Sequence, residues 1–231
     1  MAKTLYENYA SVKDLFNRAD DALGMKLSKY CFEGPASDLT KTSICQPALF
    51  LHGMAVVQVL KEREMLGEVV AALGLSLGEL TAHAFAGTFS FETGLKIVAE
   101  RGRLMQEACD ASEGAMASFI GGSVEAVAEY CKEFDVDMSN LNCPGQVVIS
   151  GEAKKIAAAV AAAKERKAFK MVVPLKVAGA YHSRLMEPAK IKFERYLEGV
   201  EFKKPNIAVF TNVTGELVSD PDYIKQNLVK Q

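Results

Sequence analysis

A serine between two glycines could act as a nucleophile in this chain. Residues 74–79 are Gly-Leu-Ser-Leu-Gly-Glu, and a Gly-x-Ser-x-Gly between an apolar strand and a helix exposes the serine hydroxyl on a sharp turn. Glycines lack a Cβ, so Gly74 and Gly78 would let strand and helix approach closely and would tolerate strained angles. The motif therefore predicts acyl chemistry at Ser76, and the alternative is a serine that only caps an ordinary helix.

The histidines decide whether that serine can react, because its hydroxyl needs a base within about 3 Å. His83 is seven residues along the same predicted helix, roughly 10 Å along its axis, and is excluded as the base. His52 begins an apolar helix, where a hydrogen-bonded structural histidine is the simpler interpretation. His182 follows a predicted strand in a loop of small residues, where catalytic groups often lie, but a turn or capping histidine fits equally well.

Arg101 stands in the apolar row of a predicted helix. It is four residues after Ile97 and three before Leu104, so all three side chains share one helix face. A buried guanidinium needs an anion, which is either a protein carboxylate or the carboxylate of a substrate held bidentately. An internal salt bridge or a snorkelling side chain is the alternative. Gly102 indicates close helix packing at the next position.

The elements around these residues follow from hydrophobic spacing and capping signals. One expects a helix over 5–23, an apolar helix over 48–60 with Pro47 at its first position, and a buried strand over 68–73. Ser90 is expected to cap a helix over 91–108. After residue 177 the pattern predicts a helix from Ser183 to Leu197, a buried strand over 207–211, and a helix that begins at Asp220-Pro221.

Between residues 114 and 177 the pattern changes to short alternations. It predicts strands over 115–121, 136–141, 147–150 and 169–177, with helices over 124–134 and 153–164. The order β-α-β-β-α-β is that of a ferredoxin-like unit. We therefore predict an α/β protein with a discontinuous large domain, residues 1–113 and 178–231, and an inserted small domain, residues 114–177.

Composition limits the class of partner. The 27 basic and 29 acidic residues are well mixed and give a net charge of −2, so no nucleic-acid or membrane-surface patch is expected. The five cysteines are widely spaced without a Cys-x-x-Cys pair, which argues against a disulfide framework and against a metal site. No apolar run approaches the length of a membrane helix, and no signal peptide is recognised. We expect a cytoplasmic monomer.

In their order along the chain, these features closely resemble the malonyl-CoA:acyl carrier protein transacylase family, the acyltransferases of fatty-acid and polyketide synthesis. The resemblance covers nearly the whole chain. Its motifs are Phe32-Glu33-Gly34-Pro35, Gln46-Pro47-Ala48-Leu49, Gly74 to Glu79, Arg101 to Gln106, Gly114 to Ala117, Asn140 to Gly151, and Tyr181 to Met186.

The resemblance implies a role for each candidate residue. Ser76 would be the acylated nucleophile, His182 its base, and Arg101 the clamp on the free carboxylate of malonate. The backbone N–H of Leu77 would be an oxyanion donor, and Gln46 would line the pocket. The implied reaction transfers malonyl from malonyl-CoA to the phosphopantetheine thiol of acyl carrier protein, without a cofactor beyond the coenzyme A thioester. The implied fold is a hydrolase-like parallel sheet between helices, with the ferredoxin-like insertion.

The chain departs from the family pattern at three places. Leu75 replaces the usual histidine before the nucleophile. Nothing before Leu5 corresponds to the family's first strand and Gly-Gln-Gly motif, and family members continue beyond Gln231. We therefore expect a chain that lacks one oxyanion donor and the support of its histidine. Two alternatives follow: a serine thioesterase or esterase with the same dyad, and an inactive acyltransferase remnant that binds carrier protein.

Overall fold

The computed structural model describes residues 1–231 and divides into two compact units. One unit consists of Met1–Leu104 and Lys192–Gln231, and the other of Met105–Ile191. Two long helices, α7 (Phe91–Asp110) and α10 (Glu187–Glu198), contribute residues to both. The predicted small domain, residues 114–177, lies within the second unit, and its exact boundaries stay a prediction.

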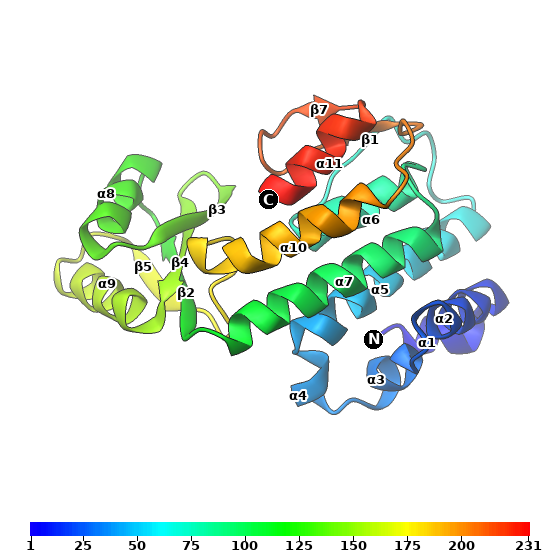
Figure 1. The fold of residues 1–231 in the computed structure, drawn as a ribbon, viewed down its shortest axis with the longest axis horizontal. Helices are drawn as coiled ribbons and strands as arrows, with labels where there is room; N and C mark the ends of the chain where they lie inside the picture. Colours follow the sequence, from blue (N-terminus) through cyan, green and yellow to red (C-terminus); the bar gives the residue numbers. More distant parts are fainter. The chain divides into compact units, whose positions relative to one another are not determined.

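Five helices form the N-terminal part of the first unit, drawn in blue shades in Figure 1. They are α1 (Lys3–Asn8), α2 (Ala10–Leu23), α3 (Leu27–Glu33), α4 (Ala36–Leu39) and α5 (Thr42–Glu62). The expected single helix over 5–23 is wrong, because Tyr9 is extended and separates α1 from α2. The break lets Tyr6 of α1 pack edge-on against Phe16 of α2, with ring centroids 5.6 Å apart.

The helix α5 also differs from its prediction. It begins at Thr42, so Pro47 lies inside it and not at its first position. A proline inside a helix costs about 3 kcal/mol, whereas burial of Phe50 and Leu51, both fully buried, contributes about 1.5–3 kcal/mol for each side chain. Packing of this apolar face therefore outweighs the proline.

One helix has the dimensions of a membrane span. The helix α5 is long and apolar enough, with a mean hydropathy of 1.5, so the expectation that no segment approaches such a length is wrong. Core helices of soluble proteins have the same length and composition. Here α5 contacts α1 to α4 and α6 (Leu77–Phe85), and 33% of its apolar window is buried inside the protein.

A small sheet carries the serine motif. The strand β1 (Ala71–Ala72) runs parallel to β6 (Ala208–Phe210), and β7 (Leu217–Val218) pairs antiparallel with β6. The helix α6 packs over β6 through Ala82, Ala86 and Val209. The expected buried strand over 68–73 is wrong in extent and burial, because only two of its residues pair. Val70 and Leu73 are 75% and 73% exposed.

The second unit has the predicted ferredoxin-like order. Its elements are β2 (Gly114–Ile120), α8 (Val124–Phe134), β3 (Asp137–Cys143), β4 (Gln146–Glu152), α9 (Ala153–Glu165) and β5 (Met171–Pro174). The strands align as β3-β4-β2-β5, and every neighbouring pair is antiparallel. The β-α-β-β-α-β prediction is confirmed, although the last strand is shorter than residues 169–177.

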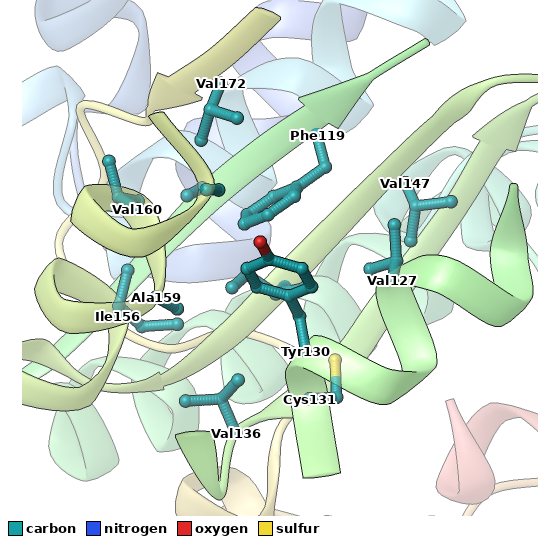
Figure 2. Close-up of a cluster of buried hydrophobic side chains, with 13 residues drawn as sticks. Phe119, Val127, Tyr130, Cys131, Val136, Val147, Ile156, Ala159, Val160 and Val172 are labelled. Atoms are coloured by element: carbon teal, nitrogen blue, oxygen red, sulfur yellow. The ribbon is translucent and has the colours of Figure 1, made fainter. Parts of the chain in front are cut away.

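The core of this unit lies between the sheet and its two helices. Phe119 of β2 and Tyr130 of α8 face each other there, with Val160 of α9 beside them (Figure 2). Alternation along β2 and helical spacing along α8 and α9 place these apolar side chains on the same side. The sheet and helices are thus held by the faces that the sequence pattern indicates.

Candidate active site

Ser76 occupies a strained turn between β1 and α6. Its backbone has φ 51° and ψ −108°, a conformation that costs a non-glycine residue on the order of 1–3 kcal/mol and is typical of functional sites. A Cβ on Gly74 would lie 2.2 Å from the backbone carbon of Gly78, whereas one on Gly78 would meet nothing within 4 Å. The close approach expected of both glycines therefore requires only Gly74.

Arg101 extends its guanidinium to the serine. Its Nη2 lies 3.0 Å from Ser76 Oγ and 2.7 Å from Gln231 Oε1, and its Nη1 lies 2.8 Å from Gln46 Oε1. Gln46 is oriented in turn by donating to Thr42 Oγ1 over 2.7 Å. All three acceptors of Arg101 are neutral groups. The helix α7 thus places a cation directly beside the candidate nucleophile.

The Arg101 side chain is buried, and that burial lowers its pKa to about 10, while the negative charge of Glu79 opposes the shift. The guanidinium therefore stays protonated at neutral pH. The sequence left two partners open for this arginine, a protein carboxylate or a substrate carboxylate. Its hydrogen bonds reach no carboxylate in the structure. The guanidinium N–H groups beside Ser76 are therefore suited to donate to an anion.

Glu79 supplies the opposite charge from the first turn of α6. It is fully buried, and its Oε2 accepts from the Asn212 backbone N–H over 2.9 Å and from Gln231 Nε2 over 2.6 Å. Burial raises the pKa of this carboxyl, opposed by hydrogen bonds from Asn212 and Gln231 and by the positive charge of Arg101. Gln231 links the two charges, because its amide accepts from Arg101 and donates to Glu79.

Asn212 joins the turn to the end of the neighbouring strand. Its Nδ2 donates to Gly74 O over 2.7 Å, and its Oδ1 accepts from the Ser76 backbone N–H. Sequence reasoning missed this residue. The signal that could have found it is its position directly after the strand over 207–211, because ligand and catalytic groups collect at the carboxyl ends of parallel strands.

Three of the predicted site residues therefore come together: Ser76, Arg101 and Gln46. Leu77 is the first residue of α6, so its N–H has no hydrogen-bond acceptor within that helix. Gln231, which sequence reasoning treated only as the end of the chain, contacts both charges of the site. No pattern in the sequence points to it, because its neighbours in space are 130 and 152 residues away.

The three histidines lie in three different segments of the chain. His83 is buried on α6, with Nδ1 3.0 Å from Thr88 Oγ1, and burial lowers its pKa to about 4. His52 is half-buried within α5. His182 belongs to the second unit, where it has a positive φ of 57°.

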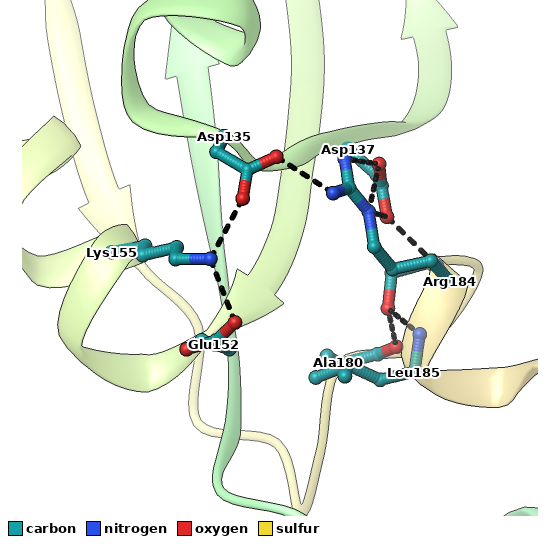
Figure 3. A network of polar contacts seen from close by, with 8 residues as sticks. Asp135, Asp137, Glu152, Lys155, Ala180, Arg184 and Leu185 are labelled. Carbon is teal, nitrogen blue, oxygen red and sulfur yellow. Dashed lines mark hydrogen bonds and ion pairs between the residues drawn. The ribbon is translucent and has the colours of Figure 1, made fainter.

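The loop that carries His182 is fixed within its own unit. Ser183 Oγ donates to Ala180 O over 2.7 Å and caps the following turn by accepting from Leu185 N. Arg184 bonds Asp137 through both its backbone N–H and its guanidinium, and also reaches Asp135 (Figure 3). The two residues that follow His182 are therefore hydrogen-bonded within this unit: Ser183 to its own loop and Arg184 to residues at the start of β3.

The chain is similar to known proteins over nearly its whole length. Residues 1–229 match the acyl transferase domain family. The chain is 40% identical over its whole length to the malonyl CoA-acyl carrier protein transacylase of Bacillus subtilis, of which it covers 74%.

The chain belongs to the malonyl-CoA:acyl carrier protein transacylase family.

Solved members share the fold of this transacylase. An acyl-carrier-protein-S-malonyltransferase from Bartonella henselae superimposes with a TM-score of 0.92 at 38% identity, and the match covers all of this chain and 75% of that one. A malonyl-transacylase solved with a type II polyketide acyl-carrier protein gives a TM-score of 0.93 at 36% identity, with the same coverage. The α/β fold class is therefore confirmed, and the transacylase spans about three quarters of these relatives.

Proposed function

We propose that this transacylase moves a malonyl group from malonyl-CoA to the phosphopantetheine thiol of an acyl carrier protein, through a malonyl ester on Ser76. The observation that carries the proposal is the contact between Arg101 and Ser76. A malonyl group on the serine oxygen ends in a free carboxylate, and a buried guanidinium beside that oxygen is the group suited to hold it bidentately.

The first half-reaction would acylate the serine. Ser76 Oγ attacks the thioester carbon while His182 accepts its proton, and the oxyanion that forms is met by the Leu77 N–H at the start of α6. The Oγ–C bond forms, the C–S bond breaks, and the proton passes from His182 to the sulfur of coenzyme A. His182 is assigned this role from the family pattern around it, Tyr181-His182-Ser183.

The second half-reaction would reverse these steps with a different thiol. The pantetheine thiol gives its proton to His182 and attacks the ester carbon, and Ser76 recovers the proton as the Oγ–C bond breaks. Serine chemistry of this kind needs no metal or cofactor beyond the thioester itself. Five free thiols suit a reducing compartment, which supports our proposal that the enzyme is cytoplasmic. That it acts as a monomer is a separate proposal.

Mass spectrometry of the intact protein tests the proposal. Incubation with malonyl-CoA should give a malonyl adduct, absent in Ser76→Ala, that disappears when holo acyl carrier protein is added and reappears on the carrier. Release of free malonate in place of transfer would instead identify a thioesterase. Binding of carrier protein without any adduct would identify an inactive remnant.

A further inference from the structure

The loop after β6 contributes one side chain to the serine turn. The amide of Asn212 brackets Leu75: its Nδ2 donates to the carbonyl of the residue before, Gly74, and its Oδ1 accepts from the N–H of the residue after, Ser76. Both bonds connect residues more than 130 positions apart in sequence. The turn that exposes the nucleophile is therefore held from outside by a single amide.

Few side chains could make both bonds. The position needs a donor for a carbonyl and an acceptor for an N–H, on two atoms of one planar group, and an amide is the group that provides this pair. A carboxylate would keep the bond to the Ser76 N–H but would place a second oxygen against Gly74 O. A hydroxyl is too short to reach both groups at once. The residue type thus matches the geometry of the turn.

The asparagine is itself held in place by a buried charge. Its backbone N–H donates to Oε2 of Glu79 over 2.9 Å, and Gln231 Nε2 contacts both that oxygen and Asn212 Oδ1, the latter over 3.2 Å. Hydrogen bonds to an ionised group are shorter and stronger than those between neutral groups. Glu79 comes from the helix that follows the nucleophile, so the turn, helix α6 and the loop after β6 form one closed network.

We propose that Asn212 is a positioning residue for the nucleophile, which keeps the strained backbone of Ser76 in the conformation that presents Oγ beside Arg101. A backbone at φ 51° relaxes unless its surroundings fix it. Because the Ser76 N–H is committed to Asn212, the Leu77 N–H is left as the donor of the turn that can meet an oxyanion. The inference rests on the proposed role of Ser76, and it concerns turnover and not substrate binding.

The kinetics of one variant and its matched control test this role. Asn212→Ala should lower kcat for malonyl transfer by about 10- to 100-fold, the loss expected from a displacement of roughly 1 Å, with KM for malonyl-CoA nearly unchanged because Arg101 and Gln46 remain. Thr214→Ala is the matched control: it removes a hydrogen bond to Glu216 N in the same loop and should leave kcat unchanged. Thermal unfolding of each variant is measured in parallel.

The isosteric Asn212→Asp variant adds a readout that a structural role would not move. When ionised, the introduced carboxyl repels Gly74 O, and when protonated it can donate to it. Glu79 nearby favours the protonated form of that carboxyl, whereas the donors of Ser76 and Gln231 and the charge of Arg101 favour the ionised form. The ratio of variant to wild-type activity should therefore rise as pH falls from about 8 to about 5.5, because protonation restores the second bond.

Labelling with a serine-directed fluorophosphonate separates this inference from the proposed function. Slower labelling of Ser76 in Asn212→Ala than in Thr214→Ala supports the positioning role even if malonyl-CoA gives no adduct. Equal labelling and equal kcat in these two variants would overturn it, as would a raised KM with unchanged kcat. If the Asn212→Ala protein fails to fold, Asn212→Asp takes its place in the labelling experiment above pH 7, and labelling as fast as in Thr214→Ala would overturn the inference.

Discussion

Arg101 donates a hydrogen bond to Ser76, with Nη2 3.0 Å from Oγ, although Arg101 lies in the middle of α7 and Ser76 directly precedes α6, 25 positions earlier. The same guanidinium is buried and hydrogen-bonded only to neutral groups on Gln46, Ser76 and Gln231. A buried cation without a directly bonded carboxylate is costly. It is compensated at longer range by Glu79, whose charge raises the pKa of Arg101 against the effect of burial.

This pairing predicts substrate selectivity. Arg101→Ala should lower kcat/KM for malonyl transfer by about 10- to 100-fold, the loss of a charged hydrogen bond of roughly 1.5–3 kcal/mol, and should affect acetyl transfer much less. Arg103→Ala is the control, because Arg103 lies on the same helix but pairs with Glu100 at the surface. Equal losses for malonyl and acetyl donors would show that Arg101 does not bind the carboxylate.

The two glycines of the motif should respond differently to alanine. In Gly74→Ala the new Cβ would lie 2.2 Å from Gly78 backbone, which cannot move aside as a flexible side chain would, so we expect a loss of several degrees in Tm and of activity. Gly78→Ala meets open space within α6 and should be neutral or raise stability by up to about 1 kcal/mol. Comparable destabilisation of both variants would contradict this assignment.

His83 should make the fold sensitive to acid. Its pKa is lowered from 6.5 to about 4 in the folded state, so the unfolded chain takes up the proton first. Its contribution to stability is therefore present above pH 6.5 and is lost as pH falls to about 4. The loss is on the order of 3 kcal/mol.

The nearby carboxyl acts in the opposite sense. Because the pKa of Glu79 is raised, this carboxyl adds stability as pH falls through its folded-state pKa. A test of His83 must therefore leave Glu79 unchanged, so that its contribution is the same in both proteins. Urea unfolding of wild type and His83→Gln across pH 7 to 4 isolates the histidine, and wild type should lose its advantage over that interval. A pH-independent difference between the two proteins would rule out a neutral buried His83.

The loop of His182 should depend on the ion pair beside it. Arg184→Ala removes the guanidinium bonds to Asp137 and Asp135, and we expect kcat to fall several-fold because the histidine two positions earlier loses its anchor. Stability should change little, because the guanidinium is exposed and water screens its attraction to the two carboxylates. Arg166→Ala, which breaks a similarly exposed pair with Glu133 in the same unit, is the control. Matching kcat values in the two variants would exclude an anchoring role.

Much of the second unit could be predicted from the sequence because its elements are local. Alternating strands, helical periodicity and the cap Ser123, whose hydroxyl accepts from Ala126 N, each require only neighbouring residues. The strand over 68–73 could not be judged in this way. Its apolar residues predict burial, but whether Val70 and Leu73 are covered depends on which elements lie beside them, and in the structure both are exposed.

The residues of the site also differ in whether local sequence signals reveal them. Ser76, Leu77 and the strained turn follow from a six-residue motif, and Arg101 is conspicuous by its place in an apolar row. Gln231 carries no such signal, and Asn212 is marked only by its place directly after a strand, because an amide becomes functional through the groups that it contacts.

The sequence by itself determined the candidate nucleophile, the arginine in the apolar row and the order of elements in the second unit, since each depends on residue type and short-range spacing. Only the tertiary structure decided what surrounds them: that Glu79 balances Arg101 through Gln231, and that Asn212 fixes the turn. The physical reason is that burial and hydrogen bonding are properties of neighbours in space, and these neighbours lie more than 130 residues from Glu79 and from Ser76 along the chain.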